Sequence, residues 1–180
     1  MAYESRPAAS MSHPDRWLAF LRVVVGLYFA KAVVTKLGIF MVGGILPLPG
    51  VSDRWIGVMP KIIAKQASDN PVLFYKHFLD NTVLTHPGIF AHLTAWGETI
   101  TGIGLTLGLM TGVASIVGLV LAINYGLATQ WMSSGQQGLH IMLVAMMIAF
   151  FFARAGRTWG LDAVLWSARP RSLFARRPFS

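Results

Sequence analysis

Glu98 is the residue of this sequence whose position most needs a chemical explanation. It lies in the run LTAWGETITGIGL, residues 93 to 105, which is otherwise apolar, small or hydroxylated. An ionisable side chain inside a membrane span costs about 2.5–3.5 kcal/mol on insertion scales, so it needs a partner, a cavity or a route to the interface. Two interpretations follow. Either Glu98 is protonated or paired with a basic residue and holds helices together, or it binds a ligand or relays protons.

Two polar residues of later apolar segments could act with this carboxylate. Asn124 is expected at a similar depth in the membrane, where it could hydrogen-bond Glu98. Tyr125 points about 100° away from Asn124 on a helix, so we expect it to pack elsewhere. His140 begins the last apolar segment at its outer end, and it is either a hydrated interfacial histidine or an inward-facing donor.

Basic residues of the first apolar segment fall on two helical faces. Arg22 and Lys36 belong to one stripe, because spacings of four and three residues return to the same face. The members of the stripe are Arg22, Gly26, Phe29, Val33 and Lys36. We expect Arg22 at the inner interface and Lys36 at the outer one, where both can snorkel. Lys31 lies almost opposite, so we expect it to meet lipid headgroups or another subunit rather than the same neighbours.

Several kinds of chemistry lack their residues in this sequence. The chain has no cysteine, which excludes disulfides, thiolate metal sites and persulfide chemistry. The histidines form no HxxxH or HxxE pair that would place two metal ligands on one helical face. The glycines at 102, 104 and 108 lie in mid-span rather than after a strand, which indicates helix packing and not a dinucleotide loop. We therefore predict no metal, flavin or haem site.

The composition points to a lipid environment. Of 180 residues, 54% are hydrophobic and only 12% are charged, whereas soluble domains carry about a quarter charged residues. The net charge is +8, but the basic residues do not form a face that could bind nucleic acid, so we expect no nucleic-acid partner. They gather near the C-terminus, as Arg154, Arg157, Arg169, Arg171, Arg176 and Arg177. The polar N-terminus, with two acidic residues, is not typical of a signal peptide.

Four apolar segments are long enough to cross a bilayer, which needs roughly 20 residues of helix. They cover about 17–39, 89–110, 113–132 and 139–155. An even number of spans places both termini on one side, and the arginines make that side cytoplasmic in a bacterial or archaeal inner membrane. We expect a tight turn at Thr111 and Gly112, an outer loop at 133–138, and a basic cytoplasmic tail over 156–180. After the fourth segment, GLDAVLWSARP suggests a short interfacial helix that is followed by basic residues.

The segment 40–87 is the long extracytoplasmic connection of this topology. Its many apolar residues exclude a disordered linker, and its prolines divide it into short pieces. We predict two short amphipathic helices, about 53–66 and 71–83, that lie on the outer membrane surface or cap the bundle. The predicted fold is thus an all-α integral membrane protein, a four-helix bundle with an outer cap, in one domain over 1–180.

Four motifs in this order resemble the DoxX/DoxD-like family of membrane proteins over nearly the whole chain. They are RVVVGLYFAKAVVTKL with Arg22 and Lys36, WGETITGIGLTLGLMTGVAS with Gly97 and Glu98, AINYGLA with Asn124, and ARAGRTWGLDAVL with Arg157 and Asp162. The outer segment NPVLFYKHFLDNTVLTHPGIFAHL is similar to the DoxD branch. That resemblance implies the small membrane subunit of a thiosulfate:quinone oxidoreductase. Other relatives are described only as membrane oxidoreductases or assembly factors.

The resemblance implies roles for particular residues. A quinone would need donors to its carbonyl oxygens, from Asn124 or an inward-facing His140, and a proton source such as Glu98. The thiosulfate dianion would need a cation, such as Lys36 or Arg157.

Arg157 and Asp162 are five residues apart, so we expect them to pair only if the chain bends at Gly160. Otherwise these two residues, with Arg22, serve the structure of the cytoplasmic end or bind an anion.

Two functional hypotheses remain open from the sequence. In the first, the chain is a quinone-interacting subunit of an oxidoreductase complex. In the second, it is a noncatalytic subunit that assembles or stabilises a larger membrane complex, with Glu98 as internal support. Lys31 and the long outer cap favour partner subunits in both cases.

Overall fold

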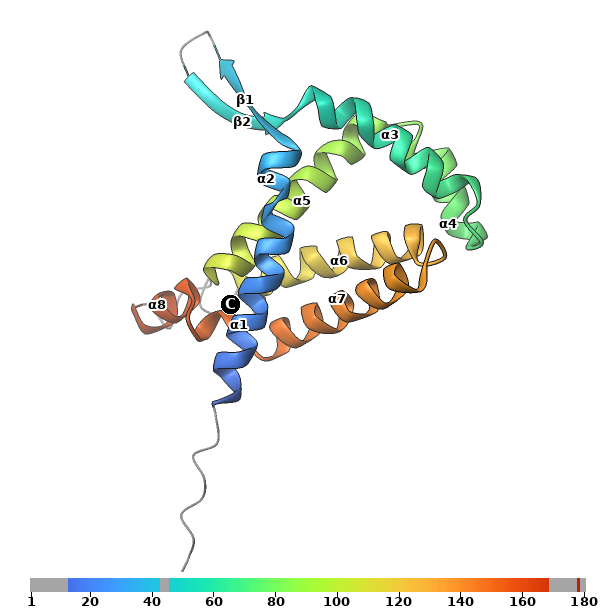
Figure 1. Ribbon diagram of the computed structural model, residues 1–180. Coiled ribbons are helices and arrows are strands. Elements are labelled where there is room, and N and C mark those ends of the chain that lie inside the picture. Colours follow the sequence, from blue (N-terminus) through green and yellow to red (C-terminus); the bar gives the residue numbers. More distant parts are fainter. Residues whose placement is uncertain (1–12, 43–45, 169–177, 179–180) are drawn as a thin grey trace, which may run out of the picture.

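The computed structural model describes residues 13–42, 46–168 and 178, and the rest of the predicted basic tail lies outside these residues. Helices dominate the described residues (Figure 1). The elements in chain order are α1 (Pro14–Ala30), α2 (Ala32–Thr35), β1 (Leu37–Val42), β2 (Leu46–Val51), α3 (Asp53–Ser68), α4 (Leu73–Phe78), the π-helix η1 (Leu79–Val83), α5 (Pro87–Leu107), α6 (Thr111–Thr129), α7 (Ser134–Phe152), the 3-10 helix η2 (Ala155–Arg157) and α8 (Leu161–Ala168).

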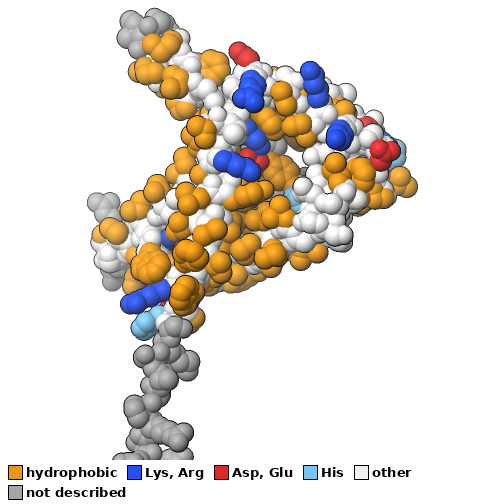
Figure 2. All heavy atoms as spheres, in the orientation of Figure 1, with side chains coloured by type: hydrophobic (Ala, Val, Ile, Leu, Met, Phe, Trp, Pro, Cys, Tyr) orange, Lys and Arg blue, Asp and Glu red, His pale blue; other side chains and the backbone are white. Residues whose placement is uncertain are grey.

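Among the described residues, three helices are long and apolar enough to cross a membrane, namely α1 continued by α2, α6 and α7. The fourth long helix, α5, has 21 residues and therefore extends about 30 Å at 1.5 Å per residue. Its length suits a span, but its glycines, threonines and Glu98 make it less apolar than the other three. In Figure 2 the face over α6 and α7 is largely hydrophobic, whereas charged side chains gather over α3 and α4.

Small residues let α1 and α5 approach closely. A Cβ atom on Gly26 would overlap Thr106 of α5, and one on Gly102 would overlap the backbone of Ala30 in α1. The interpretation of Gly102 as a residue of helix packing is therefore confirmed. Helices α6 and α7 run side by side (Figure 1). The core between the helices is formed by buried apolar residues, among them Val25, Phe29, Leu105, Ala122, Met147 and Phe150.

The first predicted span is wrong at its outer end. Instead of continuing to residue 39, the helix breaks at Lys31, and the short α2 ends at Thr35. Strand β1 then pairs antiparallel with β2, with Leu37 opposite Val51. This hairpin projects from the bundle (Figure 1). The run LGIFMV suits a strand as well as a helix, since a short apolar run carries no period that separates the two.

The outer connection contains the two predicted helices in nearly the predicted places. Helix α3 covers the segment predicted at about 53–66, and α4 with η1 covers the one predicted at about 71–83. Side-chain hydrogen bonds fix this outer cap to the long helices. Trp55 Nε1 donates to the carbonyl of Ala91 in α5 at 3.1 Å, and Asn70 Nδ2 donates to the carbonyl of Leu127 in α6 at 3.0 Å.

The two connections of α6 are displaced from their predicted positions. The turn before it lies at Gly108 to Met110 rather than at 111–112, because Gly108 adopts a φ of +63° that favours glycine. The loop after it is shorter than predicted. Ser133 caps α7 by accepting a hydrogen bond from Gln136 N at 3.2 Å, so the helix begins at Ser134. The predicted interfacial helix corresponds to α8.

Candidate functional site

Glu98 lies in a three-residue cluster between helices. Lys36 Nζ is 2.7 Å from Glu98 Oε1, and Tyr125 Oη donates to the same oxygen at 2.5 Å. The two charged side chains are only 13% and 10% exposed. Lys36 follows α2, Glu98 lies in α5 and Tyr125 in α6, so the cluster joins three segments. Lys36 is therefore the basic partner that is required by the interpretation in which Glu98 holds helices together.

Lys36 has a second neighbour in the outer cap. Its Nζ lies 4.1 Å from the centroid of the Trp55 ring, a cation–π arrangement. The hydrogen bond from Trp55 to Ala91 holds the indole in place. Lys36 is therefore held between the cap and Glu98 rather than extended to the lipid headgroups.

The predicted hydrogen bond between Asn124 and Glu98 is wrong. Asn124 Oδ1 accepts from Tyr75 Oη at 3.1 Å, and its Nδ2 donates to the carbonyl of Val120 at 2.7 Å. Successive residues point about 100° apart on a helix, and the one that faces Glu98 is Tyr125. The sequence feature that could have indicated this contact is the tyrosine itself, because a buried tyrosine hydroxyl usually has a hydrogen-bond partner.

A polar cavity of about 230 Å³ adjoins the ion pair. It is lined by Tyr28, Phe29, Lys31, Thr35, Lys36, Glu98, Tyr125, His140 and Leu143. His140 is buried, at 8% exposure, and its Nδ1 lies 2.7 Å from the carbonyl oxygen of Gln136. Since a carbonyl only accepts, this contact assigns a proton to Nδ1, and Nε2 is the nitrogen left for other partners.

Lys31 also lines this polar cavity, contrary to the prediction that it faces other neighbours than Lys36. The prediction assumed one continuous helix, whereas the helix breaks at Lys31 itself. The Lys31 ammonium lies 4.2 Å from the centroid of the Tyr28 ring.

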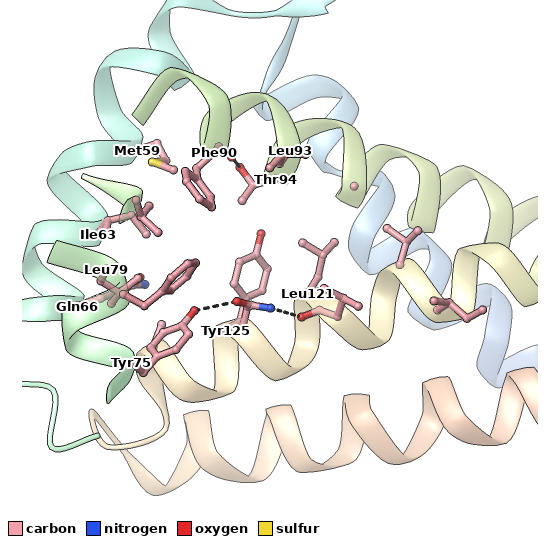
Figure 3. Close-up of a pocket in the computed structure, with 18 residues that line it drawn as sticks. Met59, Ile63, Gln66, Tyr75, Leu79, Phe90, Leu93, Thr94, Leu121 and Tyr125 are labelled. Atoms are coloured by element: carbon pink, nitrogen blue, oxygen red, sulfur yellow. Dashed lines mark hydrogen bonds between the residues drawn. The ribbon is translucent and has the colours of Figure 1, made fainter. Parts of the chain in front are cut away.

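An apolar cavity of about 370 Å³ lies between the outer cap and helices α5 and α6 (Figure 3). Its walls are mostly carbon, with polar groups contributed by Gln66, Tyr75, Thr94, Asn124 and Tyr125. The π-helix η1 contributes Leu79 and Val83, and π-helical turns are frequent at functional sites. A volume of about 300–1,000 Å³ with few polar groups is typical of small-molecule sites.

Tyr75 brings the outer cap into this apolar cavity. Its side chain is buried, and burial raises the pKa of Tyr75 to about 12. The phenol therefore stays protonated at ordinary pH and donates its hydrogen bond to Asn124. Because both residues line the cavity, this pair presents a hydroxyl and an amide to anything that enters it.

Arg22, Arg157 and Asp162 belong to the other end of the bundle. The prediction that Arg22 snorkels is wrong, because the side chain is fully buried and donates to the carbonyls of Ala155 at 2.9 Å and Trp159 at 3.0 Å. Asp162 caps α6 by accepting from Met110 N at 2.8 Å and Thr111 N at 2.9 Å.

The Arg157 guanidinium lies 4.8 Å from the centroid of the Trp166 ring in α8. Arg22 precedes Lys36 by about 20 Å of helix, so the predicted residues fall into two separate groups. One group surrounds Glu98, and the other fastens the segment after α7 to α1 and α6.

Within the described ranges, no group of three or more histidine, aspartate and glutamate side chains converges as metal ligands would. Glu98 forms an ion pair with Lys36 and accepts a hydrogen bond from Tyr125 instead.

The fold and the site define a helical membrane protein with an ion pair beside an internal apolar cavity. The family described as "TQO small subunit DoxD" matches residues 17–171, so this chain belongs to the DoxD family. Searches of the curated proteins and of the solved structures gave no match.

Proposed function

We propose that this chain is the membrane subunit through which a thiosulfate-oxidising complex transfers electrons to quinone. The family description, a small subunit, supports a place beside other subunits. The observation that carries the quinone assignment is the apolar cavity of about 370 Å³ between the outer cap, α5 and α6.

The lining of this cavity suits a quinone. Phe90, Leu121 and other apolar residues provide surface for the ring and the isoprenoid tail. Asn124 Nδ2 uses one N–H on Val120 and keeps a second for a quinone carbonyl oxygen. The Tyr75 hydroxyl can turn from Asn124 to the same oxygen. His140 and Lys36 line the polar cavity instead, so in this proposal they serve Glu98 rather than the quinone.

The sulfur chemistry belongs to a partner subunit in this proposal, because the chain has no cysteine to form a persulfide. Lys36 is neutralised by Glu98 and is therefore a weak candidate for binding the thiosulfate dianion. Of the two cations that the sequence suggested for binding thiosulfate, this leaves Arg157, which lies at the opposite end of the bundle.

The topology that we propose has four spans, α1 with α2, α5, α6 and α7. Both termini then lie on the cytoplasmic side of a bacterial or archaeal inner membrane, where Arg154 and Arg157 satisfy the positive-inside rule. Neutralisation of Glu98 by Lys36 lowers the cost of placing α5 in the bilayer. The hairpin and the cap, α3 to η1, lie outside.

The test is to purify the full chain with its partners in native lipids and to measure bound quinone and thiosulfate-dependent quinone reduction. Thr94→Phe places a ring into the apolar cavity, and Ile123→Phe adds the same ring on α6 at an exposed residue that does not line it. We expect Thr94→Phe to lose bound quinone and turnover and Ile123→Phe to keep both. Absence of quinone from the wild-type complex contradicts the proposal.

One observation favours the second hypothesis, a noncatalytic subunit. Glu98, Lys36 and Tyr125 satisfy one another, as internal supports of a bundle would. If Glu98→Gln changes only the assembly of the complex, and not quinone reduction by the complex that does assemble, this structural function is the correct one.

A further inference from the structure

Tyr125 occupies a special position between the two cavities. The lining of the apolar cavity and the lining of the polar cavity share one residue among those that the structure describes, and that residue is Tyr125. Its side chain projects from α6 toward α5 (Figure 3). The ring forms part of the apolar wall, while the hydroxyl holds Glu98, which lines only the polar cavity.

The contacts of Glu98 leave room for proton exchange on the polar side. Both Lys36 and Tyr125 contact Oε1, and the other carboxylate oxygen carries neither of these contacts. The polar cavity beside it holds about 230 Å³, enough for several waters. His140 lines the same cavity, and its ring lies edge-on to Tyr125 at 6.5 Å between centroids. Space for water and an imidazole ring are thus next to the carboxylate.

From this arrangement we infer that Tyr125 passes protons from Glu98 and the polar cavity to a quinone bound in the apolar cavity. A phenol suits this position because its oxygen accepts one proton while it gives up another. The apolar cavity itself offers little water, since its walls are mainly carbon, so protons must reach it through a side chain. The inference rests on the proposed function and adds a proton route to it.

The proposed steps balance. Reduction of a quinone to the quinol consumes two electrons, which come from the oxidation of thiosulfate, and two protons. For each proton, the O–H bond of Tyr125 breaks as an O–H bond forms at a quinone oxygen. Before each transfer the Glu98 carboxylate takes up a proton that is supplied from solution through the polar cavity, and the Tyr125 oxygen takes this proton from Glu98 as its own proton leaves. After two such transfers Tyr125 is again a phenol and Glu98 is again a carboxylate paired with Lys36.

Tyr125→Phe is the decisive variant, because it removes the hydroxyl and keeps the ring that packs in both walls. Tyr75→Phe is the matched control, since Tyr75 lines the apolar cavity alone and bonds Asn124 rather than an acid. The full complex in lipid is assayed with thiosulfate and a short-chain quinone over a range of pH, so that kcat and KM are obtained separately.

We expect Tyr125→Phe to lower kcat about 10²-fold with little change in KM and with an altered pH profile. Tyr75→Phe should raise KM and keep the wild-type pH profile. Glu98→Gln should resemble Tyr125→Phe, and the double variant should be no slower than either one, since the two residues act as one unit.

Two results would overturn the inference, and they are distinguishable. If the wild type reduces quinone and Tyr125→Phe either keeps its kcat or changes only KM, Tyr125 is a wall or a ligand contact and the proton route is wrong. If the wild type neither binds nor reduces quinone, the proposed function is wrong and the proton route is wrong with it.

Discussion

The ammonium of Lys36 lies 2.7 Å from Oε1 of Glu98, although the two residues come from different helical segments of the chain. The same ammonium lies 4.1 Å from the Trp55 ring centroid in α3. One side chain therefore joins the end of the first span, the second long helix and the outer cap. Because Glu98 also binds Tyr125 of α6, loss of the carboxylate should affect all of these contacts together.

We expect Glu98→Gln to lower the free energy of unfolding by about 3 kcal/mol, because it leaves the Lys36 ammonium buried without its counterion. The amide keeps the shape of the carboxylate, so the loss reports charge rather than packing. The double variant Lys36→Met with Glu98→Gln should recover about 1–2 kcal/mol of that loss, since no unpaired charge remains. Chemical unfolding in detergent measures both values.

The control for this pair is Asp80→Asn, which breaks the more exposed contact between Lys76 Nζ and Asp80 at 3.4 Å. Exposed pairs contribute about 0–1 kcal/mol, so this variant should unfold nearly as the wild type does. Equal losses from Asp80→Asn and Glu98→Gln would mean that the buried pair contributes no more than a surface pair.

The sequence predicts those features of the site that depend on residues close together in the chain, and not those that depend on contacts between distant helices. Helical period and composition predicted the long helices and the packing role of the α5 glycines, because both properties are local. The partners of Glu98 depend on how α2 and α6 pack against α5. The expectation that Lys36 snorkels and the preference for Asn124 over Tyr125 were both wrong, since the sequence does not fix how the helices are rotated, and Asn124 and Tyr125 point about 100° apart.

The hairpin and the break at Lys31 were missed for a different reason. An apolar segment that continues a helical stripe gives no sign of where the helix stops unless a cap or a proline marks it. Within residues 31–51 the only prolines in the sequence are Pro47 and Pro49, which lie in β2. The resulting error moved Lys31 to the wrong side of the helix and hid its place at the polar cavity.

Gly102→Ala should destabilise the protein by about 2–3 kcal/mol, because the added methyl group would overlap the backbone of Ala30 and force α1 away from α5. Gly88→Ala is the control within the same helix, since a Cβ there meets no atom within 4 Å. That control should be neutral or more stable by up to about 1 kcal/mol. Thermal unfolding of both variants compares them directly, and equal melting temperatures would contradict close packing of α1 on α5.

Tyr75 provides a prediction on pH dependence. Burial raises its pKa from 10.0 to about 12, so the folded protein holds the phenol proton more tightly than the unfolded chain does. The stability contributed by the neutral phenol is complete below pH 10 and is lost as the pH rises toward 12.

Wild type should therefore lose about 2–3 kcal/mol more stability than Tyr75→Phe over this interval. Unfolding measured at several alkaline pH values tests this expectation. Tyr28→Phe, at an exposed tyrosine, controls for the removal of a phenol. If the curves of wild type and Tyr75→Phe run parallel from pH 10 to 12, Tyr75 is not the group that titrates.

Arg22→Lys should release the segment that follows α7 while leaving the charge in place. The guanidinium donates at once to the carbonyls of Ala155 and Trp159, and a lysine ammonium lacks the planar fork that reaches both. A Cβ on Gly160 would lie 2.6 Å from Arg22 Nη1, so the backbone closes directly on this side chain. One buried carbonyl left without a donor costs about 1–3 kcal/mol.

We therefore expect Arg22→Lys to lose about 3 kcal/mol of stability and to become sensitive to trypsin after Arg154 and Arg157, as detected by mass spectrometry. Arg16→Lys, an exposed change in the same helix, should keep wild-type stability and protection. If Arg22→Lys is cleaved no faster than Arg16→Lys, the segment is held by the cap that Asp162 forms on α6 and not by the Arg22 fork.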